Sequence, residues 1–241
     1  MIARLLLLVL SLGCCPGHAV AAELRVAVAA NFRDAFDMLS DLYEQQGGSR
    51  PEGIYGSSSM LYAQISQGAP FALFLSADRD RPARLVVAGR TAGEVQIYAR
   101  GRLALWMPGR AATPDALQGG RFAMANPQLA PYGAAARACL EHLALWGENA
   151  DNAVYGTNVS QAFQFVAARA VPAGFVSYAQ LLVQNVPAAE IWLAPPDCHP
   201  PIDQGAVVLK GEREAQAAAF LAFLLSEPAQ QRLEAMGYIR P

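Results

Sequence analysis

Short apolar segments alternate with segments of helical periodicity along most of the chain. Apolar runs of strand length lie at 24–30, 53–55, 72–76, 103–107, 121–125, 153–155, 174–177, 191–193 and 205–209. Between them, apolar residues recur at helical spacing, as at 31–44, 159–169 and 214–225. Strands that alternate with helices are typical of parallel α/β units. We therefore predict an α/β fold of mostly parallel sheets flanked by helices.

The first 22 residues have the pattern of a secretory signal peptide. Arg4 precedes an apolar run at 5–12, and small residues follow up to Ala22. The run is too short for a permanent membrane span. We expect export to the periplasm with cleavage near Ala22. The residues before Cys14 fit a lipoprotein signal poorly.

The charge balance argues against two classes of partner. The chain has 18 Lys and Arg against 20 Asp and Glu, with Lys210 as the only lysine. Loss of Arg4 with the signal peptide makes the mature chain slightly more acidic. A protein without a dense basic stripe is unsuited to nucleic acid or to an anionic lipid surface. We expect an exported protein that is not embedded in a membrane.

Two cysteines remain after the signal peptide, Cys139 and Cys198. A pair of cysteines in an oxidising compartment usually forms a disulfide, and we predict this bridge. The alternative is a metal site, in which His142 and His199 would join the two thiolates. Adjacent ligands such as Cys198 and His199 rarely both reach one metal, so we expect no metal site.

Four places repeat one arrangement, in which a strand ends and a helix starts after a small or polar turn. They lie at 29–31, 56–59, 131–133 and 157–159. A helix start leaves backbone N–H groups without partners inside the helix and carries the positive end of the helix dipole. Such turns lie at the carboxyl ends of the strands, where open α/β sheets bind ligands. The four turns predict an anion site that needs no basic side chain.

The composition of the four turns limits the anion. None contains Asp or Glu, so no carboxylate is available to accept the proton of a protonated phosphate. A site made of donors suits a fully ionised dianion such as molybdate, tungstate or sulfate. Catalysis by Ser58 in an exported hydrolase is an alternative of another class. It is disfavoured because Ser58 does not sit in a Gly-x-Ser-x-Gly elbow.

Several segments of the mature chain carry a family resemblance. They are Val26-Ala27-Val28-Ala29-Ala30-Asn31-Phe32, Gly56-Ser57-Ser58-Ser59-Met60, Leu73-Phe74-Leu75-Ser76-Ala77-Asp78, Pro131-Tyr132-Gly133 and Gly237-Tyr238. From 24 to 238 the chain resembles the ModA-like family, the periplasmic molybdate-binding proteins of ABC importers. The resemblance implies a type II periplasmic-binding-protein fold, with two lobes and a ligand cleft between them.

The lobes would be discontinuous in sequence. We expect 23–103 and 206–241 to form the first lobe and 104–205 the second. The strands near 103–107 and 205–209 are the candidates for crossings between the lobes. Discontinuous lobes of this kind close on a ligand by hinge motion.

The resemblance also implies ligand contacts at Asn31, Ser58, Tyr132 and Val159. Ala30 and Ser177 would be secondary contacts, since some members place a tyrosine where this chain has Ser177. It implies a monomer without a cofactor, which carries molybdate or tungstate to an ABC permease. A sulfate receptor, or a sensor of the same fold, is the alternative that this reasoning leaves open.

Overall fold

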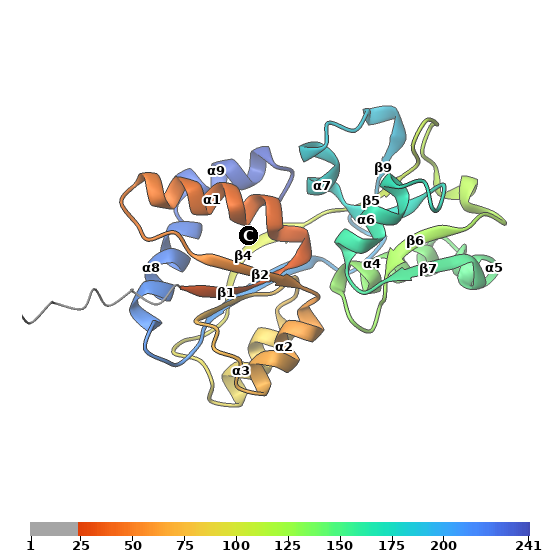
Figure 1. Ribbon diagram of the computed structural model, residues 1–241. Helices are drawn as coiled ribbons and strands as arrows, with labels where there is room; N and C mark the ends of the chain where they lie inside the picture. Colours follow the sequence, from red (N-terminus) through yellow and green to blue (C-terminus); the bar gives the residue numbers. More distant parts are fainter. Residues whose placement is uncertain (1–23) are drawn as a thin grey trace, which may run out of the picture.

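The computed structural model describes residues 24–241, which form two α/β lobes side by side (Figure 1). The predicted signal peptide and its cleavage point near Ala22 lie outside the described residues. Within the described part of the chain, no helix has the length and apolar character that crossing a membrane requires.

The first lobe is built on a five-stranded sheet in the order β2-β1-β3-β10-β4. Its strands are β1 (Arg25–Ala29), β2 (Glu52–Gly56), β3 (Leu73–Leu75), β4 (Gln96–Gly101) and β10 (Ile202–Val208). Its helices are α1 (Arg33–Gln45), α2 (Ser58–Ser66), α3 (Asp80–Val87), α8 (Glu214–Leu224) and α9 (Glu227–Ala235). Strand β1 runs parallel to both β2 and β3, whereas β10 is antiparallel to β3 and β4.

The second lobe repeats this plan in a five-stranded sheet of order β7-β6-β8-β5-β9. Its strands are β5 (Leu103–Trp106), β6 (Phe122–Ala125), β7 (Ala153–Gly156), β8 (Gly174–Ser177) and β9 (Ile191–Leu193). Its helices are α4 (Pro131–His142), α5 (Trp146–Asn149), α6 (Val159–Ala167) and α7 (Tyr178–Val183). Strand β6 is parallel to β7 and β8, and β5 is antiparallel to β8 and β9. The predicted α/β class is confirmed by these two mixed sheets with flanking helices.

Each lobe has its own apolar core, because helices cover both faces of each central strand. In the first lobe, Phe36 and Phe220 meet edge to face with ring centroids 5.6 Å apart. In the second lobe, Phe122 and Phe175 do the same at 6.1 Å. Buried aromatic pairs of this geometry add to the stabilisation that comes from removing their area from water. The lobes can therefore keep their shapes while they move relative to each other.

Two connections join the lobes. The chain leaves the first sheet at the end of β4 and enters the second at β5, with Arg102 between them. It returns through 194–201 to β10. Sheet membership thus places Leu103 in the second sheet and Ile202 in the first. The lobe boundaries at 103/104 and 205/206 were expected from the sequence alone, and as a division into domains they stay a prediction.

Several elements differ from the sequence-based expectation. Strand β4 and helices α5 and α7 were not predicted, and β10 begins at Ile202 instead of 205. The early part of β10 contains the polar residue Asp203, which pairs with Arg100 on β4. The Asp203 carboxylate oxygen and Arg100 Nε are 2.6 Å apart. A polar strand start that is paired in this way carries no apolar run for sequence reasoning to detect.

A disulfide ties the second lobe to the return connection. Cys139 on α4 and Cys198 in the segment 194–201 are bonded, with 4.5 Å between their Cα atoms and a sequence separation of 59. Both residues are buried. The bridge therefore anchors helix α4 to the segment that carries the chain back to β10. The two sulfur atoms are bonded to each other, and the described residues contain no group of three or more His, Cys, Asp or Glu placed to hold a metal.

Replacing both cysteines, as Cys139→Ser with Cys198→Ser, should lower the free energy of unfolding. A cross-link of this loop length restricts the unfolded chain and is typically worth about 2–4 kcal/mol. Urea unfolding of the double variant and of the oxidised wild type measures the difference. Thiol titration of the denatured, unreduced wild type is the control and should find no free thiol. Two free thiols, or stoichiometric zinc, would contradict the bridge.

Candidate functional site

The four strand-to-helix turns meet at one small cavity between the lobes. Strands β1 and β2 deliver the 3-10 turn Ala30–Phe32 and helix α2 from the first lobe. Strands β6 and β7 deliver α4 and α6 from the second. The cavity is lined by Ala29, Ala30, Asn31, Gly56, Ser57, Ser58, Ala77, Ala130, Pro131, Tyr132, Asn158 and Val159.

The size of this cavity restricts what it can hold. Its volume is about 10 Å³, close to the space of a single water-sized probe. Pockets for organic ligands are typically about 300–1,000 Å³. A cavity of about 480 Å³ does exist at the opposite ends of β1, β3 and β10, beside Arg25, Ala72 and Leu209. It lies away from all four turns, whereas a cavity of about 560 Å³ adjoins the turn at 131–133 and shares Ala77, Ala130 and Pro131 with the small one. Of these three cavities, only the small one is lined by all four turns.

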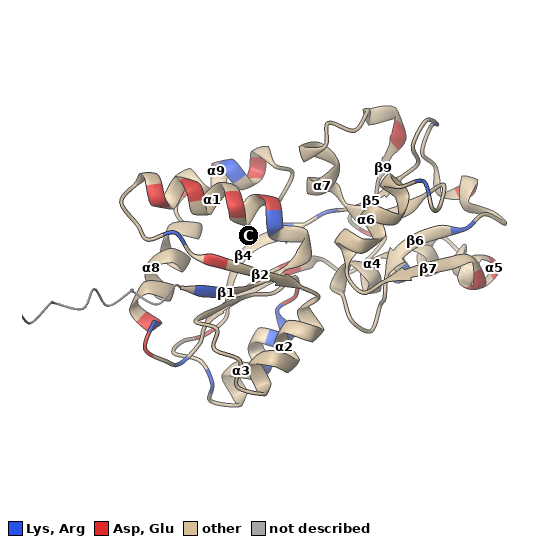
Figure 2. Ribbon diagram, viewed as in Figure 1, with Lys and Arg blue, Asp and Glu red and all other residues tan. Residues whose placement is uncertain are grey.

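The residues that line the small cavity include no Asp, Glu, Lys, Arg or His. Helix α6 likewise has no charged residue along its length, as Figure 2 shows. The polarity of the cavity therefore comes from backbone N–H groups at helix starts and from neutral side chains. Such groups favour an anion through hydrogen bonds and through the helix dipoles, without a cationic side chain.

The two polar side chains from the first lobe are fixed by hydrogen bonds. Ser58, at the start of α2, is 1% exposed, and its hydroxyl oxygen accepts a bond of 3.0 Å from the Ala77 N–H. The hydroxyl proton of Ser58 is left to donate. Asn31 is 3% exposed, and its Nδ2 donates one bond of 2.9 Å to Gln204 Oε1. An amide nitrogen has two protons, and the Asn31 side chain also contacts the Tyr132 phenol, so its second proton lies at the junction of the lobes.

The second lobe contributes mainly backbone. Val159 is the first residue of α6, and Asn158 caps this helix by accepting a bond of 3.0 Å from the Gln161 N–H. Tyr132 follows Pro131 in the first turn of α4. Backbone N–H groups in a first turn have no intrahelical acceptor. Tyr132 and Val159 are thus placed to offer backbone N–H groups to the cavity.

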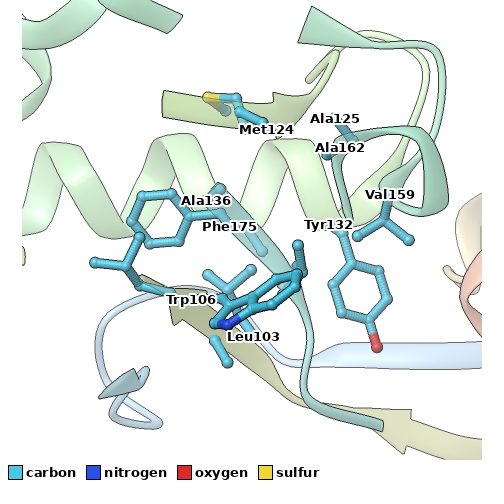
Figure 3. Close-up of a cluster of buried hydrophobic side chains, with 14 of the residues drawn as sticks. Leu103, Trp106, Met124, Ala125, Tyr132, Ala136, Val159, Ala162 and Phe175 are labelled. Carbon is cyan, nitrogen blue, oxygen red and sulfur yellow. The ribbon is translucent and has the colours of Figure 1, made fainter. Parts of the chain in front are cut away.

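The phenol of Tyr132 points out of the apolar core of its lobe. Figure 3 shows the ring beside Val159, with its oxygen directed away from Trp106, Phe175 and the other core side chains. The hydroxyl of Ser177 donates to this oxygen across 3.2 Å. Burial raises the pKa of the Tyr132 phenol well above its usual value. The phenol is therefore neutral at physiological pH and brings no negative charge toward an anion.

Contacts between the lobes close the cavity on two sides. On one side, the hydroxyl of Ser160 on α6 donates to the Ala30 carbonyl across 3.0 Å. On the other, the Ser59 N–H donates to the Leu129 carbonyl across 3.2 Å. The Ser59 hydroxyl makes a further bond of 3.2 Å to the Gln128 carbonyl. The two lobes are therefore held in direct contact on either side of the cavity.

The structure thus brings together five of the residues singled out from the sequence: Ala30, Asn31, Ser58, Tyr132 and Val159. Ser177 does not line the cavity and contacts the Tyr132 phenol instead. Sequence reasoning missed Ser59 and Ser160, which form the closing contacts, and Gln204, which holds Asn31. A serine two residues after a helix cap carries no signal that it reaches another lobe.

Comparison with known proteins agrees with this geometry. The family model of bacterial extracellular solute-binding proteins matches residues 24–239. The chain is 36% identical to the molybdate-binding protein ModA of Rhodobacter capsulatus, over 92% of this chain and 90% of that protein. It is 37% identical to the ModA of Azotobacter vinelandii, over 91% of each chain. The solved structure of the Azotobacter vinelandii periplasmic molybdate-binding protein superposes with a TM-score of 0.83 at 34% identity, covering 91% of this chain and all of that one. The chain therefore belongs to the bacterial extracellular solute-binding proteins and, among them, to the ModA-like family.

Proposed function

We propose that the protein captures molybdate or tungstate in the cavity between its lobes and delivers the ion to the permease of an ABC importer. The observation that carries the proposal is the meeting of four helix-start turns, two from each lobe, around a cavity whose lining includes no charged side chain. Relatives of this chain that are named as molybdate-binding proteins support molybdate as the ion. Delivery takes place in the periplasm, where the predicted signal peptide directs the chain.

The chemistry of the lining favours a fully ionised tetrahedral oxyanion. The hydroxyl of Ser58 and the side-chain amide of Asn31 donate from the first lobe. The backbone N–H groups of Tyr132 and Val159 donate from the second, and Ala30 completes the wall. Hydrogen bonds to a charged acceptor are roughly twice as strong as neutral ones. Four or more such bonds, made by preorganised donors, replace the water that the ion loses on entry.

Discrimination against phosphate follows from what the lining lacks. Phosphate at neutral pH still carries a proton, which requires an acceptor in a dry site. The lining contains no carboxylate to accept it. Discrimination against sulfate has a different origin, because sulfate and molybdate are both unprotonated dianions and differ in size. It depends on how closely the two lobes approach around the ion.

We propose no catalytic role for Ser58. A serine nucleophile requires an adjacent base that removes its proton. Helix α4 starts at the cavity and ends at His142, about 16 Å further along its axis at 1.5 Å per residue. His199 is exposed beside Pro200, to whose carbonyl its ring nitrogen is bonded. Neither histidine is placed to activate Ser58.

Molybdate should raise the melting temperature of ligand-stripped protein, and phosphate should not. A ligand that binds only the native state adds about 2.7 kcal/mol of stability at 100 times its dissociation constant. Scanning calorimetry with molybdate, tungstate, sulfate and phosphate at equal concentration and ionic strength measures the rise in melting temperature that each ion produces. Equal shifts with molybdate and phosphate would show that the absent acceptor does not set the selectivity.

Changing Ser58 should weaken binding in a graded way. Ser58→Ala removes the hydroxyl donor but keeps the backbone donors of α2. A hydrogen bond to a charged group is worth about 1.5–3 kcal/mol, so we expect molybdate affinity to fall about 10- to 150-fold. Ser58→Asp should fall much further, because it places a like charge beside the dianion.

Ser66→Ala, at the far end of the same helix, is the matched control and should bind as wild type does. Calorimetric titration of the three variants gives the affinities. Unchanged affinity in both Ser58 variants would mean that the serine turn only starts a helix and that the binding site lies elsewhere.

A further inference from the structure

A buried glutamine lies behind the ligand cavity. Gln204 is on β10, the strand that returns the chain to the first lobe, and it is fully buried. The pairing of β10 with β4 shifts register between Gln204 and Gly205. A bulge of this kind re-aims a side chain and is frequent beside functional sites.

The Gln204 side chain makes two contacts through its oxygen. Oε1 accepts the 2.9 Å bond from Asn31 Nδ2 and a 3.0 Å bond from the Tyr98 hydroxyl. The Asn31 carbonyl in turn accepts a bond of 2.8 Å from the Tyr238 hydroxyl. Asn31 is therefore held through its side chain by Gln204 and through its backbone by Tyr238. The Asn31 side chain also contacts the Tyr132 phenol of the second lobe.

The nitrogen of the Gln204 amide, in contrast to the oxygen, makes no hydrogen bond. Gln204 Nε2 is buried and has no hydrogen-bond partner among the described residues. Leaving a buried donor unpaired costs about 1–3 kcal/mol, and an apolar side chain would avoid that cost. The same replacement would leave Asn31 Nδ2 and the Tyr98 hydroxyl without their acceptor, so the amide is retained for its oxygen while its nitrogen stays unpaired.

The unpaired nitrogen faces the point where the second lobe meets the first. Gly101, at the end of β4, lies between the two lobes. A Cβ atom on Gly101 would come within 2.2 Å of the Tyr132 hydroxyl oxygen and 3.1 Å of Gln204 Nε2. The absence of a side chain at Gly101 thus makes a space that the Tyr132 phenol and the Gln204 amide share. In this arrangement the Tyr132 phenol of the second lobe occupies this space.

We propose that Gln204 is a positioning residue for the anion cavity, which acts on both lobes at once. Through Oε1 it holds the Asn31 amide so that one N–H donates to the ion. Its Nε2 lies beside the space that the Tyr132 phenol fills, at the junction of the two lobes. The inference rests on the proposed function, because it assigns a role toward the ion to a residue that does not line the cavity.

The groups around Gln204 carry no net charge, which explains why this position has an amide and not a carboxylate. The phenols that surround Gln204 come from β4, α4 and the C-terminal segment, as Tyr98, Tyr132 and Tyr238. Burial raises the pKa of each of these phenols, so all three are uncharged. The nearby carboxylates are paired, Asp78 with Arg81 and Asp203 with Arg100. A carboxylate in place of the Gln204 amide would introduce a buried negative charge beside Asn31, behind the proposed position of the dianion.

A pair of glutamines allows a matched test. Gln230 on α9 is also buried and also contacts Tyr98, but its Nε2 donates to the carbonyls of Tyr98 and Leu224. Gln204→Met should lower molybdate affinity about tenfold or more, the effect of one misplaced hydrogen bond to a charged group. Gln230→Met loses two bonds that hold α9. It should lower the melting temperature of the ligand-free protein and leave molybdate affinity unchanged.

Gln204→Glu gives a second readout that a purely structural role would not produce. Buried glutamates have pKa values as high as about 8–9. We expect this variant to bind molybdate progressively more weakly between about pH 6 and about pH 9, as the new carboxyl ionises, while wild-type affinity stays level.

The outcomes separate the two proposals. If wild type binds none of the four oxyanions, the proposed function is wrong. If wild type binds molybdate and both Gln204 variants bind it equally well at every pH, Gln204 has no positioning role. An affinity loss in Gln230→Met as large as in Gln204→Met would also overturn the inference, because it would show a general response to altered packing around Tyr98.

Discussion

Unpaired backbone N–H groups at helix starts, contributed by two separate lobes, are the feature on which the rest of the structure depends. Each lobe supplies only part of the donor set, with Ser58 and Asn31 on one side and Tyr132 and Val159 on the other. An anion that bound one lobe would keep much of its water. In the proposed site, donors on both sides would let the ion hold the lobes together, alongside the direct contacts of Ser160 with Ala30 and of Ser59 with Leu129.

The repeated topology explains how such a site is built from ordinary elements. In each sheet, three neighbouring strands run parallel and aim their carboxyl ends at the cleft. The fourth strand of each sheet, β10 or β5, follows a connection from the other lobe and runs antiparallel. The connections are therefore close to the ligand turns. A bulge at Gln204 and a glycine at position 101 allow the closing lobe to fit against them.

The sequence predicted the fold class and the residues whose role is local. Strand-to-helix turns can be recognised from an apolar run followed by Ser, Asn or Gly, and the family resemblance then singled out Asn31, Ser58, Tyr132 and Val159 within these turns. The remaining parts depend on distant neighbours. Gln204 lies 173 positions from Asn31, and the polar start of β10 shows no apolar pattern. Ser177 was expected as a contact by resemblance, yet in the structure it supports the phenol of Tyr132.

Proton exchange on binding tests the central claim most directly. If a dianion is held only by neutral N–H and O–H donors, no group in the protein changes protonation when molybdate binds. Calorimetric titration at about pH 8, where unperturbed carboxyls are ionised and phenols are protonated, is repeated in buffers of low and high ionisation heat. The account predicts the same binding heat in each buffer. A heat that changes with the buffer, corresponding to about one proton taken up or released per ion, would contradict it.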